Sequence, residues 1–289
     1  MESDQAALRK AWQAFEAGRF PDAEQECLEQ LVRFPNDADA LHLLGLILFR
    51  NGKADSGLEL LDRAIDADPA NTAVLMSRAG MLQGLGRFYE ALTCCERALE
   101  IEPENRIALL NRARLLERFL QFEESVQCYQ RLIALNRSDA DAWPLLCNAL
   151  VCLGRLDEAL FNYDRLLDIM PGNAAEWYNR GNLLHQLNQH EEALASYARS
   201  LDNAPEFPNT WYNRGNILYE LQRYEEALGC FRQTVHLDPG YLTGWLNRGN
   251  TELALDRPKE AIICFDQAID RKPDYAEAWM NRDISKCCV

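Results

Sequence analysis

The sequence repeats itself every 34 residues, and this period constrains the fold more than any other feature. The segment Trp177 to Asn182 recurs letter for letter at 211–216. A fixed period between about 20 and 50 residues is typical of units that cannot bury their own apolar face and therefore stack on copies of themselves. The sequence thus predicts a solenoid. Tryptophan marks five successive places of the period: Trp143, Trp177, Trp211, Trp245 and Trp279.

Each period contains two helical patterns separated by a short break. In the first unit, apolar residues recur at spacings of three and four, and the break falls at Gly18 and Arg19. Proline closes most units because it cannot donate an intrahelical hydrogen bond and restricts the residue before it. The prolines are Pro35, Pro69, Pro103, Pro171, Pro205, Pro239 and Pro273, and Arg137 stands at the one missing place.

These patterns predict an all-α fold, an α-solenoid of about eight antiparallel helical hairpins followed by a C-terminal helix. One domain is expected over residues 1–289. Alanine and glycine at fixed places of the period predict close helix crossings, where a larger side chain would push the axes apart. The hairpins are expected at about 4–37, 38–71, 72–105, 106–139, 140–173, 174–207, 208–241 and 242–275, and a capping helix at 276–289.

The pattern resembles the tetratricopeptide repeat over essentially the whole chain. One unit places Trp177, Gly181, Leu184, Ala193, Tyr197 and Pro205 on the consensus positions of that repeat. The resemblance is greatest to the repeats of O-linked N-acetylglucosamine transferases and of bacterial scaffold proteins. It implies a right-handed superhelix whose concave groove is lined by the first helix of each hairpin. Departures such as Gly57, Ser125, Glu252 and Asp283 affect the packing of single hairpins.

Composition narrows the possible partners and compartments. The net charge is −15, so nucleic acid is excluded as an expected partner, whereas a neutral or basic polypeptide fits. No apolar run approaches the length of a membrane span, and the start lacks the pattern of a signal peptide. A cytoplasmic location is expected. Four cysteines recur at one place of the period and are predicted to be buried free thiols: Cys94, Cys128, Cys230 and Cys264.

Two series of asparagines and three tyrosines are the candidate peptide-binding residues. A ladder of carboxamides along the groove can hold an extended peptide by its backbone, since each side chain both donates and accepts. One repeat advances about 10 Å, which matches about three extended residues. Alternatively, these asparagines belong to the repeat consensus and satisfy neighbouring groups of the protein itself. The residues are Asn111, Asn148, Asn179, Asn182, Asn213, Asn216, Asn247, Asn250 and Asn281, with Tyr178, Tyr212 and Tyr219.

No catalytic or metal-binding constellation is expected. The four histidines show no ligand spacing, no cofactor motif is complete, and no nucleophile, base and orienting group can be assembled. The predicted function is therefore that of a non-enzymatic scaffold or adaptor that binds a peptide or partner domain in its groove. Two alternatives stay open: the substrate-recognition arm of a larger transferase, and a self-associating assembly protein.

Self-association would use the C-terminal end. Trp279 is expected to pack inward against the last hairpin, with Asp283 and Lys286 facing water. The remaining residues make this helix more apolar than an efficient cap, which predicts an adhesive end and a possible homo-oligomer. These residues are Met280, Ile284, Cys287, Cys288 and Val289.

Overall fold

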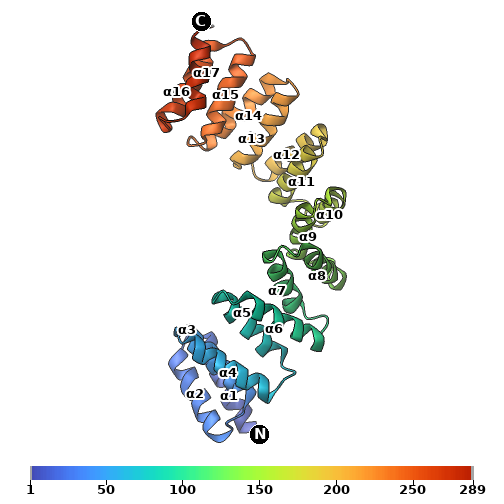
Figure 1. Cartoon of the computed structure of the whole chain (residues 1–289), viewed down its shortest axis with the longest axis vertical. Coiled ribbons are helices and arrows are strands. Elements are labelled where there is room, and N and C mark those ends of the chain that lie inside the picture. The colour runs from blue at the N-terminus through green and yellow to red at the C-terminus, as the bar shows by residue number, and fades with distance from the viewer. Residues whose placement is uncertain (1, 288–289) are drawn as a thin grey trace. The chain divides into compact units, whose positions relative to one another are not determined.

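A computed structural model describes residues 2–287 as seventeen α-helices without any β-strand in that range (Figure 1). Fourteen of these helices form seven pairs in which a first helix packs against the second helix that follows it. The predicted all-α fold of helical hairpins is therefore confirmed. Cys288 and Val289, which contributed to the predicted adhesive end, lie outside the described residues.

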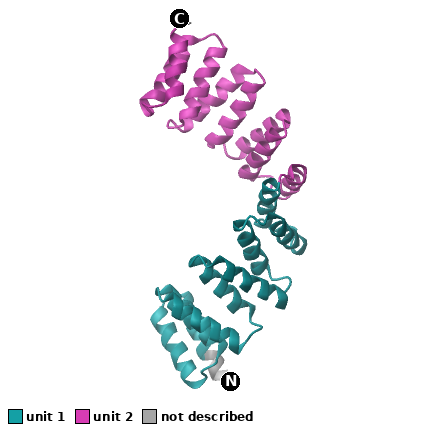
Figure 2. Ribbon diagram, viewed as in Figure 1, with its two compact units in different colours: residues 1–153 teal, residues 154–289 magenta. Residues whose placement is uncertain are grey.

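The chain divides into two compact units, residues 1–153 and 154–289 (Figure 2). In unit 1, the first four first helices each pack against the second helix that follows them, and successive hairpins stack. Its helices are α1 (Glu2–Glu16), α2 (Phe20–Arg33), α3 (Ala38–Arg50), α4 (Ala54–Ala67), α5 (Thr72–Gly84), α6 (Phe88–Ile101), α7 (Arg106–Arg118), α8 (Phe122–Leu135) and α9 (Ala142–Cys152).

Unit 2 has the same internal organisation and ends with a single helix. Its helices are α10 (Leu156–Ile169), α11 (Ala174–Gln186), α12 (His190–Asn203), α13 (Pro208–Glu220), α14 (Tyr224–Leu237), α15 (Leu242–Ala254), α16 (Pro258–Arg271) and α17 (Ala276–Lys286). One continuous solenoid domain over 1–289 and its right-handed sense stay predictions.

The recurring tryptophan has a defined role at the start of each first helix. The Trp177 indole Nε1 donates a hydrogen bond of 2.8 Å to the backbone oxygen of Pro171, which joins the helix to the preceding turn. The same bond to a proline six residues earlier is formed by Trp211, Trp245 and Trp279. Trp143 forms it with Arg137, where the proline is missing. The interaction depends on a backbone oxygen, so the fourth unit keeps it without its proline.

The expected close crossings are present within the hairpins. A Cβ atom placed on Gly181 would lie 2.6 Å from the Tyr197 ring, and one on Gly57 would lie 2.8 Å from the backbone oxygen of Gly45. Glycine at 57 therefore brings α3 and α4 into backbone contact. The alanines at the crossings are fully buried: Ala23, Ala91, Ala159, Ala193, Ala227 and Ala261. The four recurring cysteines are buried, and the nine cysteines in the described part of the chain are free thiols.

Two details near the C-terminus differ from simple expectation. Trp279 is 41% exposed, contrary to the predicted inward packing; Ala278 and Ser285 are the residues of α17 that are buried. No further hairpin follows in the described residues to cover the outer face of this tryptophan. Glu252 is only 1% exposed, and it forms ion pairs with Arg232 and Arg257 at 3.1 and 3.6 Å.

Candidate functional site

The two asparagine series meet in unit 2 and join successive repeats. The Asn213 Nδ2 donates to the Asn182 Oδ1 at 2.9 Å and to the Tyr178 hydroxyl at 3.1 Å. The next repeat reproduces both bonds, from Asn247 to Asn216 and Tyr212. Asn281 donates to Asn250 at 2.9 Å. Much of the carboxamide ladder thus connects the first helices α11, α13, α15 and α17 to one another.

The ladder follows a simple sequence rule. Each donor asparagine bonds an asparagine 31 residues earlier in the chain. It also bonds the residue 35 positions earlier where that residue is a tyrosine with a hydroxyl group. Asn111 of α7 is the exception in unit 1, because Met76 and Gly80 occupy those two places and offer no side-chain oxygen. Asn148 lies exposed on α9, also in unit 1. In unit 2, Asn179 donates to the buried Glu176 at 3.2 Å.

Two of the three candidate tyrosines are engaged in packing between repeats. Tyr178 is half-buried against Phe207, with ring centroids 5.3 Å apart, and Tyr212 packs on Tyr241 at 5.0 Å. Tyr219 differs because its side chain is exposed and borders a pocket. Partial burial of the hydroxyl group, followed by the neighbouring Tyr224, raises the pKa of Tyr219, so this group stays a neutral donor and acceptor near neutral pH.

Several candidate residues converge on a single pocket in unit 2. The pocket has a volume of about 280 Å³ and draws its walls from the first helices of three successive hairpins, α11, α13 and α15. Four of its residues belong to the predicted set, and two were not anticipated. The lining residues are His185, Asn216, Tyr219, Glu220, Asn247 and Asn250.

The unanticipated residues belong to a histidine and carboxylate cluster at the ends of the helices. The His185 Nε2 lies 3.1 Å from the Glu220 Oε2, and the ring of His190 lies 5.6 Å from that of His185. The histidines show no ligand spacing in the sequence, which therefore predicts no such cluster. The signal was present in the period: His185 and Glu220 are 35 residues apart, which is the same step that joins Tyr178 to Asn213.

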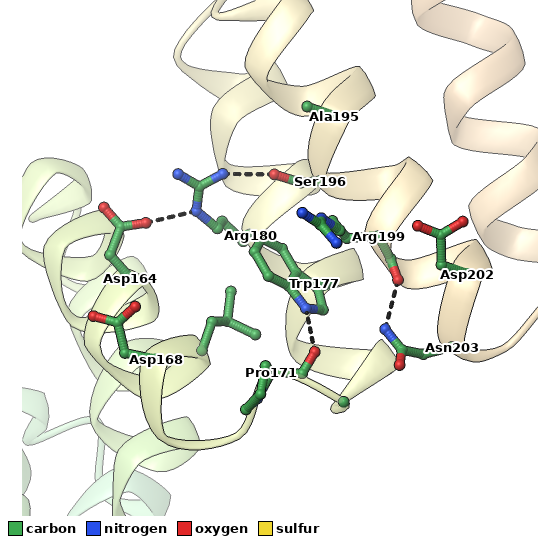
Figure 3. A pocket seen from close by; sticks show the side chains of 12 residues that line it. Asp164, Asp168, Pro171, Trp177, Arg180, Ala195, Ser196, Arg199, Asp202 and Asn203 are labelled. Atoms are coloured by element: carbon green, nitrogen blue, oxygen red, sulfur yellow. Dashed lines mark hydrogen bonds and ion pairs between the residues drawn. The ribbon is translucent and has the colours of Figure 1, made fainter.

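A larger crevice of unit 2 is lined by residues of α10, α11 and α12 (Figure 3). Its volume is about 860 Å³, and Arg180 crosses it to contact Asp164 at 2.7 Å and Ser196 at 2.6 Å. A similar crevice in unit 1 places Arg78 between Asp62 and Cys94. Because the same pairings recur in both units, this crevice is a general feature of the repeat.

The stacked helical hairpins and their small-residue crossings define the chain as a helical repeat protein. Profiles described as tetratricopeptide repeat match residues 8–72, 82–140, 113–174, 208–241 and 242–275, and one described as TPR repeat matches 181–221. The chain belongs to the tetratricopeptide repeat family. No curated protein sequence matches the chain.

Three solved structures are similar to this chain, and two of them are described as tetratricopeptide repeat proteins. YrrB, described as having an unusual peptide-binding site, is 25% identical with a TM-score of 0.55 and covers 65% of this chain and 97% of its own. A repeat protein from Parabacteroides merdae ATCC 43184 is 18% identical with a TM-score of 0.55, covering 99% and 100%. The structure of Naa15/Naa10 bound to HypK-THB is 17% identical with a TM-score of 0.62, covering 96% and 43%.

The fold is that of a protein-interaction scaffold. None of the helices in residues 2–287 has the length and apolar character needed to span a membrane.

Proposed function

We propose that unit 2 binds an extended peptide segment of a partner protein along the first helices α11, α13 and α15. The observation that carries this proposal is the convergence of those three helices on the pocket around Tyr219. Successive repeats spaced by about 10 Å would contact about every third residue of an extended peptide.

The ladder leaves hydrogen-bonding capacity for such a peptide. Asn216 and Asn250 each accept a ladder bond through Oδ1, which leaves the two protons of their Nδ2 able to donate to peptide carbonyl groups. The Tyr197 hydroxyl donates a hydrogen bond to the Asn182 Oδ1, but the next two repeats have Phe231 and Phe265 at the place of Tyr197. Phenylalanine has no hydroxyl, so the Oδ1 atoms of Asn216 and Asn250 each keep a second lone pair that can accept from a peptide. The asparagines therefore stabilise the stack through one part of the amide and can bind ligand with the other.

The pocket also favours a side chain of particular chemistry. Tyr219 supplies a rigid aromatic surface, and Glu220 supplies a half-exposed carboxylate. The net charge of −15 adds a long-range preference for a basic or neutral ligand. YrrB, a similar protein, is described as having a peptide-binding site, which supports peptide binding by this chain.

Selection from a displayed library of random peptides tests the proposal with the full chain as bait. Selected peptides are expected to carry a basic residue and to lose at least about tenfold in affinity on Tyr219→Leu combined with Asn216→Ala. Leucine is a matched replacement, because Leu253 holds the same place in the following repeat.

Ile263→Ala is the control, because Ile263 is an exposed apolar residue on the second helix α16, outside the pocket. It should leave the affinity unchanged. Selected peptides that bind the pocket variant as tightly as the unchanged protein would place binding elsewhere and contradict the proposal.

Self-association through the C-terminal end is a second candidate, supported by the exposed apolar residues Met280 and Ile284 on α17. Light scattering over a range of protein concentrations is expected to show dimers that Met280→Lys with Ile284→Lys returns to monomers. A monomer at every concentration, with and without reductant, would exclude this candidate.

A further inference from the structure

The histidine and carboxylate cluster at the edge of the pocket has the composition of a metal site. His185 lies in the last turn of α11, His190 begins α12 across the turn, and Glu220 ends α13 of the next hairpin. One potential ligand atom from each of the three side chains lies within 4.8 Å of the other two. We propose that His185, His190 and Glu220 bind one divalent transition-metal ion of the Zn²⁺ type.

The distances fit such an ion after a small adjustment. Two ligand atoms on a tetrahedral zinc ion, each about 2.1 Å from the metal, are about 3.4 Å apart. The separation of 3.1 Å between His185 Nε2 and Glu220 Oε2 is already close to this value. The imidazole of His190 needs to approach by at most about 1.5 Å, which rotation of its ring and small shifts of the neighbouring side chains can provide.

A second observation concerns His190 itself. Its Nδ1 is buried and has no hydrogen-bond partner among the described residues. A buried polar atom without a partner is unfavourable, and such atoms are rare in folded proteins unless a ligand or water satisfies them. An imidazole with an unsatisfied ring nitrogen, next to a second imidazole and a carboxylate, matches the ligand preference of zinc and related ions.

Two of the three helix ends at the site favour a cation, whereas the N-terminal end of α12, where His190 lies, has the opposite partial charge. The C-terminal ends of α11 and α13 carry partial negative charge from carbonyl groups that lack helical partners. Glu220, the last residue of α13, adds a full negative charge at an end where a carboxylate is otherwise unfavourable. A bound cation would offset both. Three protein ligands would leave at least one coordination position facing the pocket for water or another ligand.

The period supplies matched variants for the test. At the places of His185 and His190, the next repeat has Tyr219 and Tyr224, whose rings pack edge to face at 5.2 Å. The pair His185→Tyr and His190→Tyr therefore replaces both ligands with residues that this repeat geometry already accommodates. Gln186 holds the place of Glu220 in the preceding repeat, so Glu220→Gln is equally conservative.

The experiment uses the full chain without an affinity tag, kept reduced, and titrates it with Co²⁺ followed by Zn²⁺. We expect one Co²⁺ per chain, visible d–d absorption without a sulfur-to-cobalt charge-transfer band, and displacement by Zn²⁺. Glu220→Gln should weaken binding by at least about tenfold, and the double tyrosine variant should abolish it. Circular dichroism checks that the variants remain folded.

Two controls separate this site from other ligands. His236→Gln changes an exposed histidine of the same unit, and Cys152→Ser changes an exposed thiol; both should bind Co²⁺ as the unchanged protein does. Tyr219→Leu with Asn216→Ala should also keep the metal, so failure of peptide binding and failure of metal binding are distinguishable. The proposal would be overturned if Co²⁺ binding did not saturate. It would also be overturned if the double tyrosine variant and Glu220→Gln bound Co²⁺ as tightly as the unchanged protein.

Discussion

The two units use the same step between repeats for different chemistry. In unit 1, the His42 Nε2 lies 2.7 Å from the Ser77 hydroxyl, 35 residues further on. In unit 2, the same step joins Tyr178 to Asn213. Both contacts link the first helices of adjacent hairpins, yet one buries a titratable imidazole and the other a neutral phenol and amide.

This difference shows that the repeat fixes where side chains meet, whereas the residue at each place decides what the contact does. In unit 2, donors and acceptors match over several repeats and form the ladder. In unit 1, apolar or small residues such as Met76 and Gly80 interrupt it. The proposed peptide groove is therefore a property of unit 2, although both units share one fold.

The largest expected effect is the pH dependence of unit 1. His42 is 6% exposed, and burial lowers its pKa to about 4, against 6.5 in the unfolded chain. Between these values the unfolded state binds the proton more readily. The stabilising contribution of neutral His42 is thus present above pH 6.5 and is lost as the pH falls through about 4. Full loss corresponds to about 3 kcal/mol of unfolding free energy.

Urea unfolding of the wild type and of His42→Met over this pH range measures that contribution. Methionine is the matched replacement, since Met76 holds the same place in the next repeat. The variant should lose less stability on acidification than the wild type. Equal losses in the two proteins would show that His42 titrates as an exposed histidine.

The second prediction concerns the hairpin crossings, where Gly215 of unit 2 faces the ring of Phe231 and one repeat of unit 1 has Ala79 and Cys95 at the corresponding places. A Cβ on Gly215 would lie 2.8 Å from the Phe231 ring. Gly215→Ala should therefore cost about 1 to 3 kcal/mol by overpacking, measured by denaturant unfolding. In a Phe231→Cys background, which reproduces the unit 1 pair, the same change should cost less.

Gly229→Ala is the control for helix propensity, because nothing lies within 4 Å of a Cβ at this exposed position. It should stabilise by up to about 1 kcal/mol. An equal cost of Gly215→Ala in both backgrounds would show that the ring does not set the size limit at this crossing.

The third prediction compares two asparagines at one place of the period. Asn213→Ala removes two bonds to the preceding repeat and should cost about 1 to 2 kcal/mol of unfolding free energy. Asn111→Ala should cost less, because Met76 and Gly80 provide no side-chain acceptor for its amide. Thermal unfolding of both variants checks the order, and a larger loss for Asn111→Ala would contradict the structural role of the ladder.

The smallest effect is expected at Glu252, which occupies the place of Leu184 and Leu218 in earlier repeats. Replacing a buried charge by a well-packed apolar residue is often neutral or stabilising. Glu252→Leu should leave the unfolding free energy unchanged or raise it by about 1 kcal/mol, since Arg232 and Arg257 can turn to solvent. Calorimetry measures the change; a clear loss of stability would show that the ion pairs hold α14 to α15.

The period located most of the fold, because helix ends and turn prolines are decided within one or two turns of the chain, and the small crossing residues recur at fixed places in each hairpin. It also selected Asn216, Tyr219, Asn247 and Asn250, four of the six residues around the pocket. It did not separate them from Tyr178 or Tyr212, which pack between repeats. Whether a residue lines the pocket or packs between repeats depends on the offset between stacked helices. The spacing of residues along the sequence does not give this offset.

The sequence by itself thus determined the hairpin, its 34-residue period and the family, because each rests on local helix formation and on which residues are too large for a crossing. Only the tertiary structure decided that Asn213 reaches Asn182 and that His185, His190 and Glu220 come together. These contacts join residues from different helices or hairpins. Their geometry is set by the crossing angle and axial offset of the stacked helices, which emerge only when the hairpins pack.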